Sequence, residues 1–264
     1  MTATDPKSVD QDLLSKVPPV TLAFWLIKIC ATTVGETGGD ALSMTLNLGY
    51  AVSTLIFLGY FAVALAGQLA ARRFHPALYW ALVVATTTVG TTTSDYLDRT
   101  AGLGYIKSSI LLFGGVLAVL FVWRRVTGAI AVDHITDRKN EAFYWLTILV
   151  SNTLGTALGD FMADDAGLGF EGGALVFSGL IALVGLAYLF TKVPRAILFW
   201  TAYVLTRPLG ATLGDLLTKP HDHGGLDLGR FGSSFAIAAV MVAGILLTHR
   251  RGAARPATAV AGEP

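Results

Sequence analysis

The stretch GETGGD, residues 35–40, ends the apolar run FWLIKICATTV of residues 24–34 with three glycines and two carboxylates. Similar stretches recur as GTTTSD at 90–95, GTALGD at 155–160 and GATLGD at 210–215. In each copy a tryptophan stands ten residues before the first glycine and fifteen before the aspartate. These tryptophans are Trp25, Trp80, Trp145 and Trp200. Recurrence at fixed offsets indicates four internal repeats.

The composition is that of an integral membrane protein. Of the 264 residues, 53% are hydrophobic and 14% are charged, and the mean hydropathy is +0.61. A soluble domain carries about a quarter charged residues. The long apolar runs therefore predict membrane helices. The net charge of +1 gives no basic surface for nucleic acid, so no nucleic-acid partner is expected.

Each repeat reads as a pair of transmembrane helices joined by a turn-like patch after the aspartate. We predict an all-α fold of eight transmembrane helices, at 19–39, 49–71, 76–94, 104–124, 141–159, 170–191, 195–214 and 229–249. The predicted units are a tail at 1–17, repeats one and two at 18–126, a linker at 127–141, repeats three and four at 142–250, and a tail at 251–264.

Basic residues set the expected orientation. One side of this helix map holds Lys7, Lys16, Arg72, Arg73, Arg124, Arg125, Arg138, Lys139, Lys192, Arg195, Arg250, Arg251 and Arg255. The opposite loops hold Arg99, Lys107, Lys219 and Arg230. The positive-inside rule then predicts cytoplasmic termini and places the four motifs toward the outer face. Because every repeat has two helices, the repeats are parallel and pseudo-symmetric about the membrane normal.

Four tandem two-helix units, each with its Trp, Gly and Asp, resemble a bacterial membrane-protein family built from a tandem repeat of unknown function. The resemblance runs from about residue 18 to residue 250. It implies a location in the bacterial inner membrane and carries no activity with it.

The motif has a purely structural interpretation. A second small residue follows each first glycine by four positions, at Gly39, Ser94, Gly159 and Gly214. Small residues at this spacing let two helix backbones approach closely in lipid. The aspartate that follows would cap the next turn or lie at the wet interface.

A functional interpretation rests on polar stripes that share a helical face with these aspartates. The stripe residues are Thr33, Glu36 and Thr37 in repeat one, Thr88, Thr91 and Thr92 in repeat two, Thr153 and Thr156 in repeat three, and Thr212 in repeat four. Upstream, at one shared offset, stand Thr32, Thr87, Asn152 and Arg207. Threonines can bond back to their own helix, but carboxylates and an arginine in lipid should face the protein interior.

If the repeats surround an axis, their stripes converge there. Asp40, Asp95, Asp160 and Asp215 would then ring the outer mouth, with Glu36 below them. Carboxylate oxygens suit divalent cations such as Mg²⁺, Ca²⁺ and Mn²⁺. The sequence therefore predicts a metal site formed by these five carboxylates, with the stripe residues along an ion pathway.

Two basic residues lie within the predicted helices. Arg207 needs a partner in lipid, and Glu36 is the nearest carboxylate in register, so we predict a Glu36–Arg207 pair. An alternative is that Arg207 binds an anionic substrate beside the helix break at Pro208. Lys28 is expected to extend its ammonium group to the cytoplasmic surface.

The leading functional prediction is a transporter or channel for a small ion, with a divalent cation as the favoured substrate. No resident cofactor is expected. No GxxxxGK[ST], HExxH or GxSxG motif is present, so neither a nucleotide-driven motor nor these common hydrolase sites are expected. The alternatives are a small organic-anion carrier using Arg207, a non-transporting scaffold or accessory protein, and a membrane enzyme. The expected partners are the lipid bilayer and a small ion or molecule, while the oligomeric state stays open.

Overall fold

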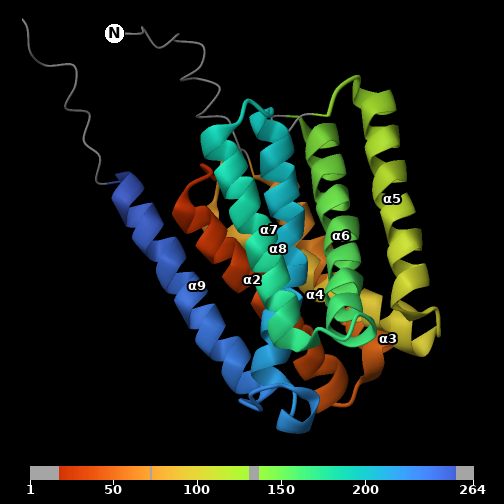
Figure 1. The fold of residues 1–264 in the computed structure, drawn as a ribbon. Helices are drawn as coiled ribbons and strands as arrows, with labels where there is room; N and C mark the ends of the chain where they lie inside the picture. Colours follow the sequence, from red (N-terminus) through yellow and green to blue (C-terminus); the bar gives the residue numbers. More distant parts are fainter. Residues whose placement is uncertain (1–17, 72, 131–136, 254–264) are drawn as a thin grey trace, which may run out of the picture.

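The computed structural model describes residues 18–71, 73–130 and 137–253, and its architecture is all-helical (Figure 1). The long helices form four consecutive pairs, as the repeats predict. They are α2 (Leu22–Asp40), α3 (Gly49–Ala70), α4 (Pro76–Asp95), α5 (Gly104–Thr127), α6 (Arg138–Asp160), α7 (Gly169–Phe190), α8 (Arg195–Thr218) and α9 (Arg230–Ala253). The predicted linker is too long at its end, because α6 already begins at Arg138. The predicted tail at 1–17 lies outside the described residues.

The first helices of the four repeats form a closed inner ring. Helix α2 packs against α4, α4 against α6, α6 against α8, and α8 against α2. Each outer helix packs chiefly on the inner helix of the next repeat: α3 on α4, α5 on α6, α7 on α8, and α9 on α2. The predicted convergence of the four stripes on one axis is therefore met by the packing.

Four of the described helices, not eight, are long and apolar enough to cross a membrane by length and composition. These are the outer helices α3, α5, α7 and α9. The inner helices have the required length, but their polar stripes lower their hydropathy. A helix enclosed by other helices can carry such a stripe because the polar groups face protein and not lipid.

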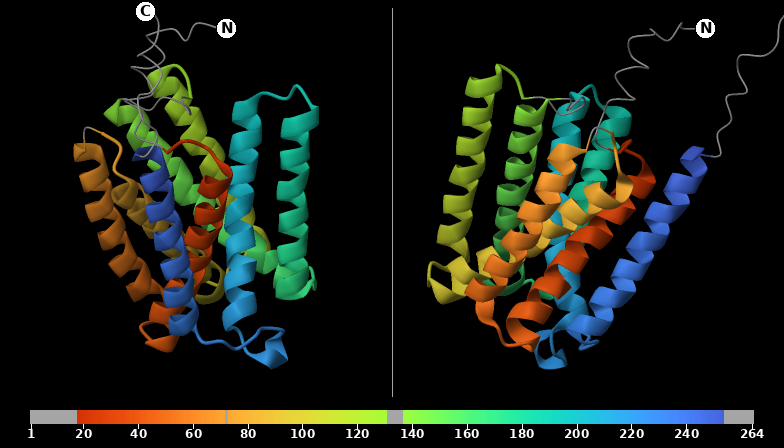
Figure 2. Two further views of the ribbon diagram at one scale, coloured as in Figure 1. Left: turned by 90° about the vertical axis from the view of Figure 1, so that its left-hand side faces the viewer. Right: turned by 180° about the vertical axis from the view of Figure 1, so that it is seen from behind.

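The two ends of the bundle differ. At one end lie the start of α2 and the end of α9, and we call it the terminal end (Figure 2). The other, the motif end, holds the four motif aspartates and the turns after them. Aromatic residues close the inner ring at the terminal end, where Tyr79 and Tyr144 meet with hydroxyls 3.3 Å apart. The same register in the other two repeats holds Phe24 and Phe199, which are 6.3 Å apart between ring centroids.

The turns after the motif repeat their backbone conformation. A π-helical turn follows Asp40, Asp95 and Asp160 at η1 (Ala41–Thr45), η2 (Tyr96–Thr100) and η3 (Phe161–Asp165). Because the backbone stays helical, these aspartates make no capping hydrogen bond, and the capping interpretation is wrong for them. In repeat four α8 continues to Thr218, and a short 3-10 helix, η4 (His221–His223), follows.

A Leu-Gly step then leads into each outer helix. Positive φ angles occur at the residue before the leucine and at the glycine after it, in the pairs Asn47 and Gly49, Gly102 and Gly104, Gly167 and Gly169, and Asp227 and Gly229. Glycine, asparagine and aspartate tolerate this left-handed region best. All four repeats therefore share this backbone step at the start of the outer helix.

Candidate functional site

The first glycine of each motif lies against the next repeat around the ring. A methyl group on Gly35 would overlap the side chain of Thr87, and one on Gly210 would overlap Thr32. The same substitution at Gly90 would meet Asn152 at 3.0 Å, and at Gly155 it would meet Arg207 at 2.6 Å. The predicted close approach of the helices is confirmed, and its partners are the four residues at the shared upstream offset.

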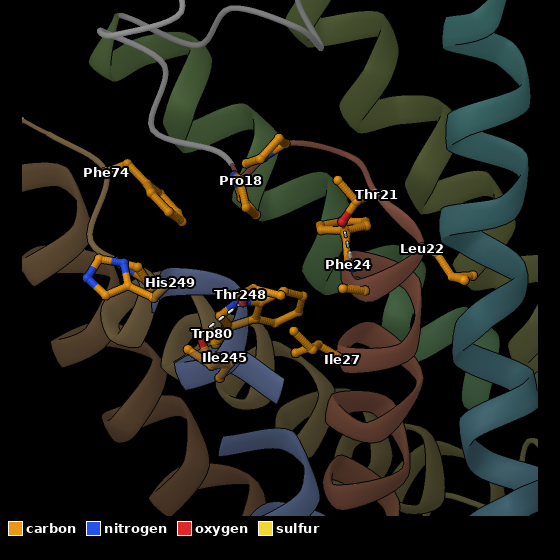
Figure 3. A pocket seen from close by; sticks show the side chains of 13 residues that line it. Pro18, Thr21, Leu22, Phe24, Ile27, Phe74, Trp80, Ile245, Thr248 and His249 are labelled. Atoms are coloured by element: carbon orange, nitrogen blue, oxygen red, sulfur yellow. Dashed lines mark hydrogen bonds between the residues drawn. The ribbon is translucent and has the colours of Figure 1, made fainter. Parts of the chain in front are cut away.

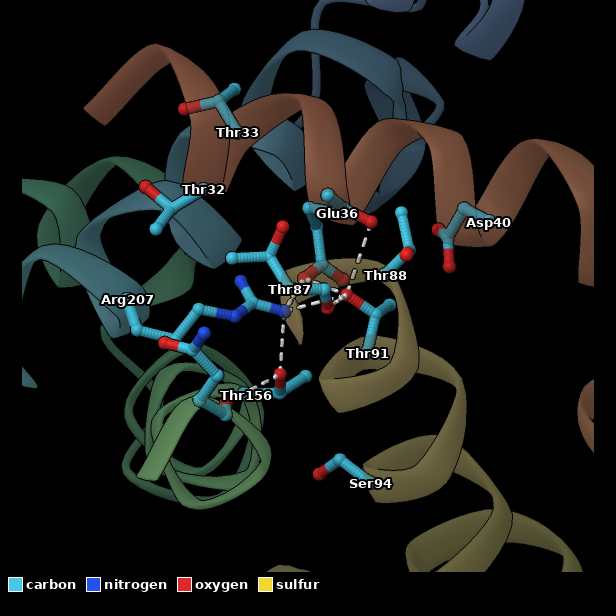
Figure 4. Close-up of polar contacts among 12 residues, drawn as sticks. Thr32, Thr33, Glu36, Asp40, Thr87, Thr88, Thr91, Ser94, Thr156 and Arg207 are labelled. Atoms are coloured by element: carbon cyan, nitrogen blue, oxygen red, sulfur yellow. Dashed lines mark hydrogen bonds and ion pairs between the residues drawn. The ribbon is translucent and has the colours of Figure 1, made fainter. Parts of the chain in front are cut away.

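Arg207 lies at the centre of the ring and contacts the three other repeats (Figure 4). Its Nη2 lies 2.9 Å from Glu36 Oε2 and 2.6 Å from the hydroxyls of both Thr91 and Thr156. Thr91 also donates to Glu36 Oε2 at 3.1 Å. The predicted Glu36–Arg207 pair is confirmed.

The register of this layer explains why one arginine fits. Glu36, Thr91 and Thr156 occupy equivalent positions in repeats one to three, and the equivalent position in repeat four is Ala211. The small alanine leaves the centre of the layer to the Arg207 side chain, which is fully buried. The axis of the ring is thus filled at this level.

Part of the Arg207 guanidinium has no partner. Its Nε and Nη1 atoms form no hydrogen bond with any residue that the structure describes. An unpaired buried donor costs about 1–3 kcal/mol. The Nε and Nη1 atoms therefore keep hydrogen-bonding capacity that the described residues do not use.

The four motif aspartates are buried, with 1% to 3% of each exposed, and they lie in two bridged pairs. Arg99 joins Asp95, at 3.2 Å, to Asp160, at 3.7 Å. Lys219 joins Asp215, at 3.1 Å, to Asp40, at 3.0 Å. Basic side chains of the protein itself, Arg99 and Lys219, therefore bridge the predicted ring of carboxylates.

Sequence reasoning assigned Arg99 and Lys219 only to the outer loops. Each follows its motif aspartate by four residues, a spacing that brings side chains together on a helix. This four-residue spacing is the sequence feature from which the two ion pairs could have been predicted. A third base, Arg230 at the start of α9, reaches Asp40 with its Nε at 3.5 Å.

The carboxylates keep these two bases charged. Burial alone would lower the pKa of Lys219, but Asp215 and Asp40 outweigh that effect and hold its pKa well above the usual range. The pKa of Arg99 is likewise raised, because Asp95 and Asp160 outweigh its burial. Both bases are therefore positively charged at neutral pH.

Three of the predicted metal ligands come together. One carboxylate oxygen each from Glu36, Asp40 and Asp215 lie within 4.8 Å of one another, and all three residues are buried. Three carboxylate oxygens at this spacing could surround a hard cation. Within the described part of the chain, Asp95 and Asp160 do not join this cluster.

Most of the predicted pathway threonines bond back to their own helix. Thr33, Thr88, Thr92, Thr153 and Thr212 donate to backbone carbonyls one turn earlier. Thr37 meets the Ser234 hydroxyl at 2.7 Å, and Asn152 donates to Thr86 at 3.0 Å. Of the predicted stripe, Thr91 and Thr156 are the hydroxyls that reach the central arginine.

The expectation for Lys28 is wrong. Its side chain is fully buried, and its Nζ lies 3.3 Å from the Thr206 hydroxyl and 4.2 Å from the centroid of the Tyr203 ring. Neighbouring helices α4, α8 and α9 surround α2, so the lysine cannot reach water. A second buried basic side chain therefore lies one layer from Arg207 toward the terminal end.

One further carboxylate lies in the turn after the second motif. Asp98 is 7% exposed and accepts hydrogen bonds from Ser94, at 3.1 Å, and from Ser108. Burial raises the pKa of Asp98, although both hydroxyls act against the rise. This contact ties the π turn η2 to the first turn of α5.

A comparison with protein families matches all four repeats. The model described as Repeat of Unknown Function (DUF347) covers residues 23–74, 78–129, 143–193 and 198–253, which is more than half of the chain. No curated protein and no solved structure matches the sequence. Each matched range holds one inner and one outer helix, and the chain belongs to the DUF347 repeat family.

Proposed function

We propose that this chain is an integral membrane carrier for a small cation, with a divalent metal ion as the preferred substrate. The observation that carries the proposal is the buried cluster of Glu36, Asp40 and Asp215, in which the ammonium group of Lys219 lies between the carboxylates of Asp40 and Asp215. Carboxylates buried in a membrane protein are costly and typically mark an ion pathway.

Lys219 would act as a tethered substitute for the substrate. Its ammonium group neutralises Asp40 and Asp215 when no ion is bound, so the empty site avoids an uncompensated buried charge. An arriving cation would displace this ammonium group. Because Lys219 directly follows the last residue of α8, its side chain would then move into the outer turn. The carboxylates would then be free to coordinate the ion.

The charge balance favours a divalent ion. Five carboxylates lie at the motif end and centre: Glu36, Asp40, Asp95, Asp160 and Asp215. They contact four basic side chains: Arg99, Arg207, Lys219 and Arg230. With these groups ionised, removal of the Lys219 charge leaves two negative charges in excess, and one divalent cation neutralises them.

The closed axis supports a carrier over an open channel. Arg207 fills the centre of the ring, and aromatic residues fill it at the terminal end. A continuous pore would need both layers to part at once. Alternating opening of the two ends would be driven by an ion or proton gradient, since the chain has no nucleotide motif.

The proposed setting is the bacterial inner membrane with all eight helices spanning it. The outer helices have the apolar surface for this, and the inner ring would cross inside them. The bias of basic residues toward the terminal end supports an orientation with both termini in the cytoplasm and the motif end outside.

Calorimetry with Mg²⁺, Ca²⁺ and Mn²⁺ on the purified protein tests this proposal. We expect Asp215→Asn to abolish binding, whereas Asp160→Asn, at the same register outside the cluster, keeps it. Lys219→Gln should bind about tenfold more tightly, a gain of about 1.4 kcal/mol, because the tethered competitor is gone. Lys219→Arg, which keeps the charge, should not show this gain.

Failure of both the wild type and Lys219→Gln to bind any of these ions would overturn the cation proposal, provided both are folded. Uptake of the bound ion into proteoliposomes, with Asp215→Asn as the inactive control, then separates a carrier from a protein that merely binds metal.

One observation favours a second candidate, a carrier of a small organic anion. The Nε and Nη1 atoms of the fully buried Arg207 have no hydrogen-bond partner among the described residues. A carboxylate would accept a charge-assisted hydrogen bond from one of these two atoms. Binding of a carboxylate such as acetate or succinate that Arg207→Lys abolishes would support this candidate.

A non-transporting scaffold is favoured by the glycine contacts. Gly35 and Gly210 pack directly on neighbouring helices, and most stripe threonines are satisfied within their own helix. A dry, close-packed motif layer would suit a structural role. Single cysteines introduced at Thr91 and Thr156 can be tested for reaction with a water-soluble thiol reagent. A carrier must expose this layer in one of its states and should react, whereas a scaffold should not.

A further inference from the structure

A separate apolar pocket lies at the terminal end of the bundle (Figure 3). Its walls come from three places: the start of α2, the segment leading into α4, and the last turns of α9. Phe24, Ile27, Phe74, Trp80 and Ile245 supply most of the apolar surface. The pocket is remote from the motif aspartates, so the proposed cation site does not use it.

The pocket lies where α9 approaches α2 and α4 at the terminal end, and α9 and α2 are inclined in the same direction (Figures 1 and 2). Helix α9 packs on α2 along its length, yet its contacts with α4 and α8 are few. Near the terminal end this leaves a space of about 600 Å³ between α2, α4 and α9. A volume of this size is typical of small-molecule sites, which lie at about 300–1,000 Å³.

The lining selects an apolar ligand. Phe24, Ile27 and Trp80 are 4% to 5% exposed and form the inner wall. The polar lining residues Thr21, Thr248 and His249 are exposed. A ligand with an apolar tail and a polar head therefore matches the distribution of polarity.

The level and the charge of the mouth point to a lipid. His249 lines the pocket, and Arg250 and Arg251 follow the apolar run of α9 directly after it, so the mouth would lie at the boundary of the hydrocarbon region. Arg73 directly precedes the lining residue Phe74 in the sequence, and Arg250 and Arg251 directly follow His249. Clustered basic residues at a membrane surface attract anionic headgroups.

We propose that this pocket binds one acyl chain of an anionic phospholipid, with the headgroup held at the basic mouth beside His249 and Arg73. The acyl chain enters between α2 and α9 and packs against Trp80. The site would link the lipid composition of the cytoplasmic leaflet to the contact between the first and last helices. The alternative occupant is the chain's own segment before Pro18, which carries Leu13, Leu14 and Val17 but also three aspartates.

Trp80 provides a probe inside the pocket. The protein is reconstituted in phosphatidylcholine vesicles that contain either phosphatidylglycerol or phosphatidylcholine with brominated acyl chains, since bromine quenches tryptophan fluorescence on contact. The fluorescence of Trp80 alone is obtained by subtracting the fluorescence of Trp80→Phe from that of the wild type. Trp25→Phe, which removes a tryptophan of α2 that is not among the lining residues, is the matched control.

We expect brominated phosphatidylglycerol to quench the fluorescence of Trp80 more than brominated phosphatidylcholine does. Thr248→Phe, which fills the pocket, should remove this quenching. The double variant Arg73→Gln, His249→Gln should keep quenching but lose the preference between the two lipids. The phosphatidylglycerol that remains bound through detergent purification, measured by mass spectrometry, should fall in Thr248→Phe.

Equal quenching by the two lipids in the wild type would overturn the headgroup assignment. Absence of quenching of Trp80 would overturn the acyl-chain site altogether. If quenching emerges only after residues 1–15 are deleted, the chain's own N-terminal segment is the occupant and the proposal is wrong.

Discussion

Arg207 of repeat four and Glu36 of repeat one form a buried ion pair, with Nη2 and Oε2 2.9 Å apart. Neither residue can reach water, since the exposed fraction is 0% for the Arg207 side chain and 4% for that of Glu36. The pair joins the last inner helix to the first, where the ring closes. Its two hydroxyl neighbours, Thr91 and Thr156, bring repeats two and three into the same contact.

This pair is expected to be needed for folding. Arg207→Met leaves Glu36 as an uncompensated buried charge, and loss of one partner of a buried pair costs about 3–5 kcal/mol. Thermal unfolding of the purified protein should show a large fall in midpoint. The double variant Arg207→Met, Glu36→Gln should recover part of it, and a double variant no more stable than the single one would show that the pairing is not the cause.

The glycine contacts predict a sharp difference between two neighbours in α2. Gly35→Ala would force its methyl group into Thr87 and should destabilise the protein by about 1–3 kcal/mol, the usual cost of overpacking. Gly38→Ala meets nothing within 4 Å and should be neutral or slightly stabilising, because alanine favours helix. Unfolding midpoints in one detergent compare them directly, and equal effects would contradict close packing at Gly35.

Loss of the Arg99 bridge should be compensated by removing the negative charge of one of the aspartates that it joins. Arg99→Gln leaves Asp95 and Asp160 unbridged and should cost about 1–3 kcal/mol, less than the loss of Arg207 because Arg99 is 32% exposed. Adding Asp160→Asn should restore stability, while adding Asp40→Asn, in the other bridged pair, should lower it further. Rescue by both aspartate variants alike would mean that only the total charge matters.

Asp98 predicts a pH dependence of stability. Because burial raises its folded pKa above the ordinary 3.8, its contribution is fully present below pH 3.8 and is lost as the pH rises through the raised pKa. The stability difference between wild type and Asp98→Asn should therefore shift against the wild type over that window. Asp222→Asn, an exposed aspartate in η4, serves as the control, and an unchanging difference would argue against the assigned pKa.

Much of the fold could be predicted from the sequence because the repeats fix it. The spacing of tryptophan, glycine and aspartate located every helix pair, and the cost of an unpaired arginine in lipid identified Glu36 as the partner of Arg207. Lys28 was misjudged because a lysine near a helix start looks able to reach water. Only the packing shows that α4, α8 and α9 surround it.

The neighbours of each helix could not be predicted. Periodicity marks the polar face of a helix, but not which other helix covers its opposite face. That each outer helix packs on the inner helix of the next repeat follows from tertiary contacts, which the periodicity of one helix does not specify. The bridges by Arg99 and Lys219 were within reach, since each base follows its aspartate by four residues, but a count of loop charges concealed that local signal.

The order of packing around the ring also orders the assembly of the chain. Helices α4, α6 and α8 are each synthesised directly after the outer helix that covers them, whereas α2 is made first and its cover, α9, last. During synthesis Lys28, Glu36 and Asp40 of α2 must therefore wait for their partners until Thr206, Arg207 and Lys219 have been made. A chain that ends after the third repeat would leave these three polar groups without the contacts from α8 and α9 that bury them.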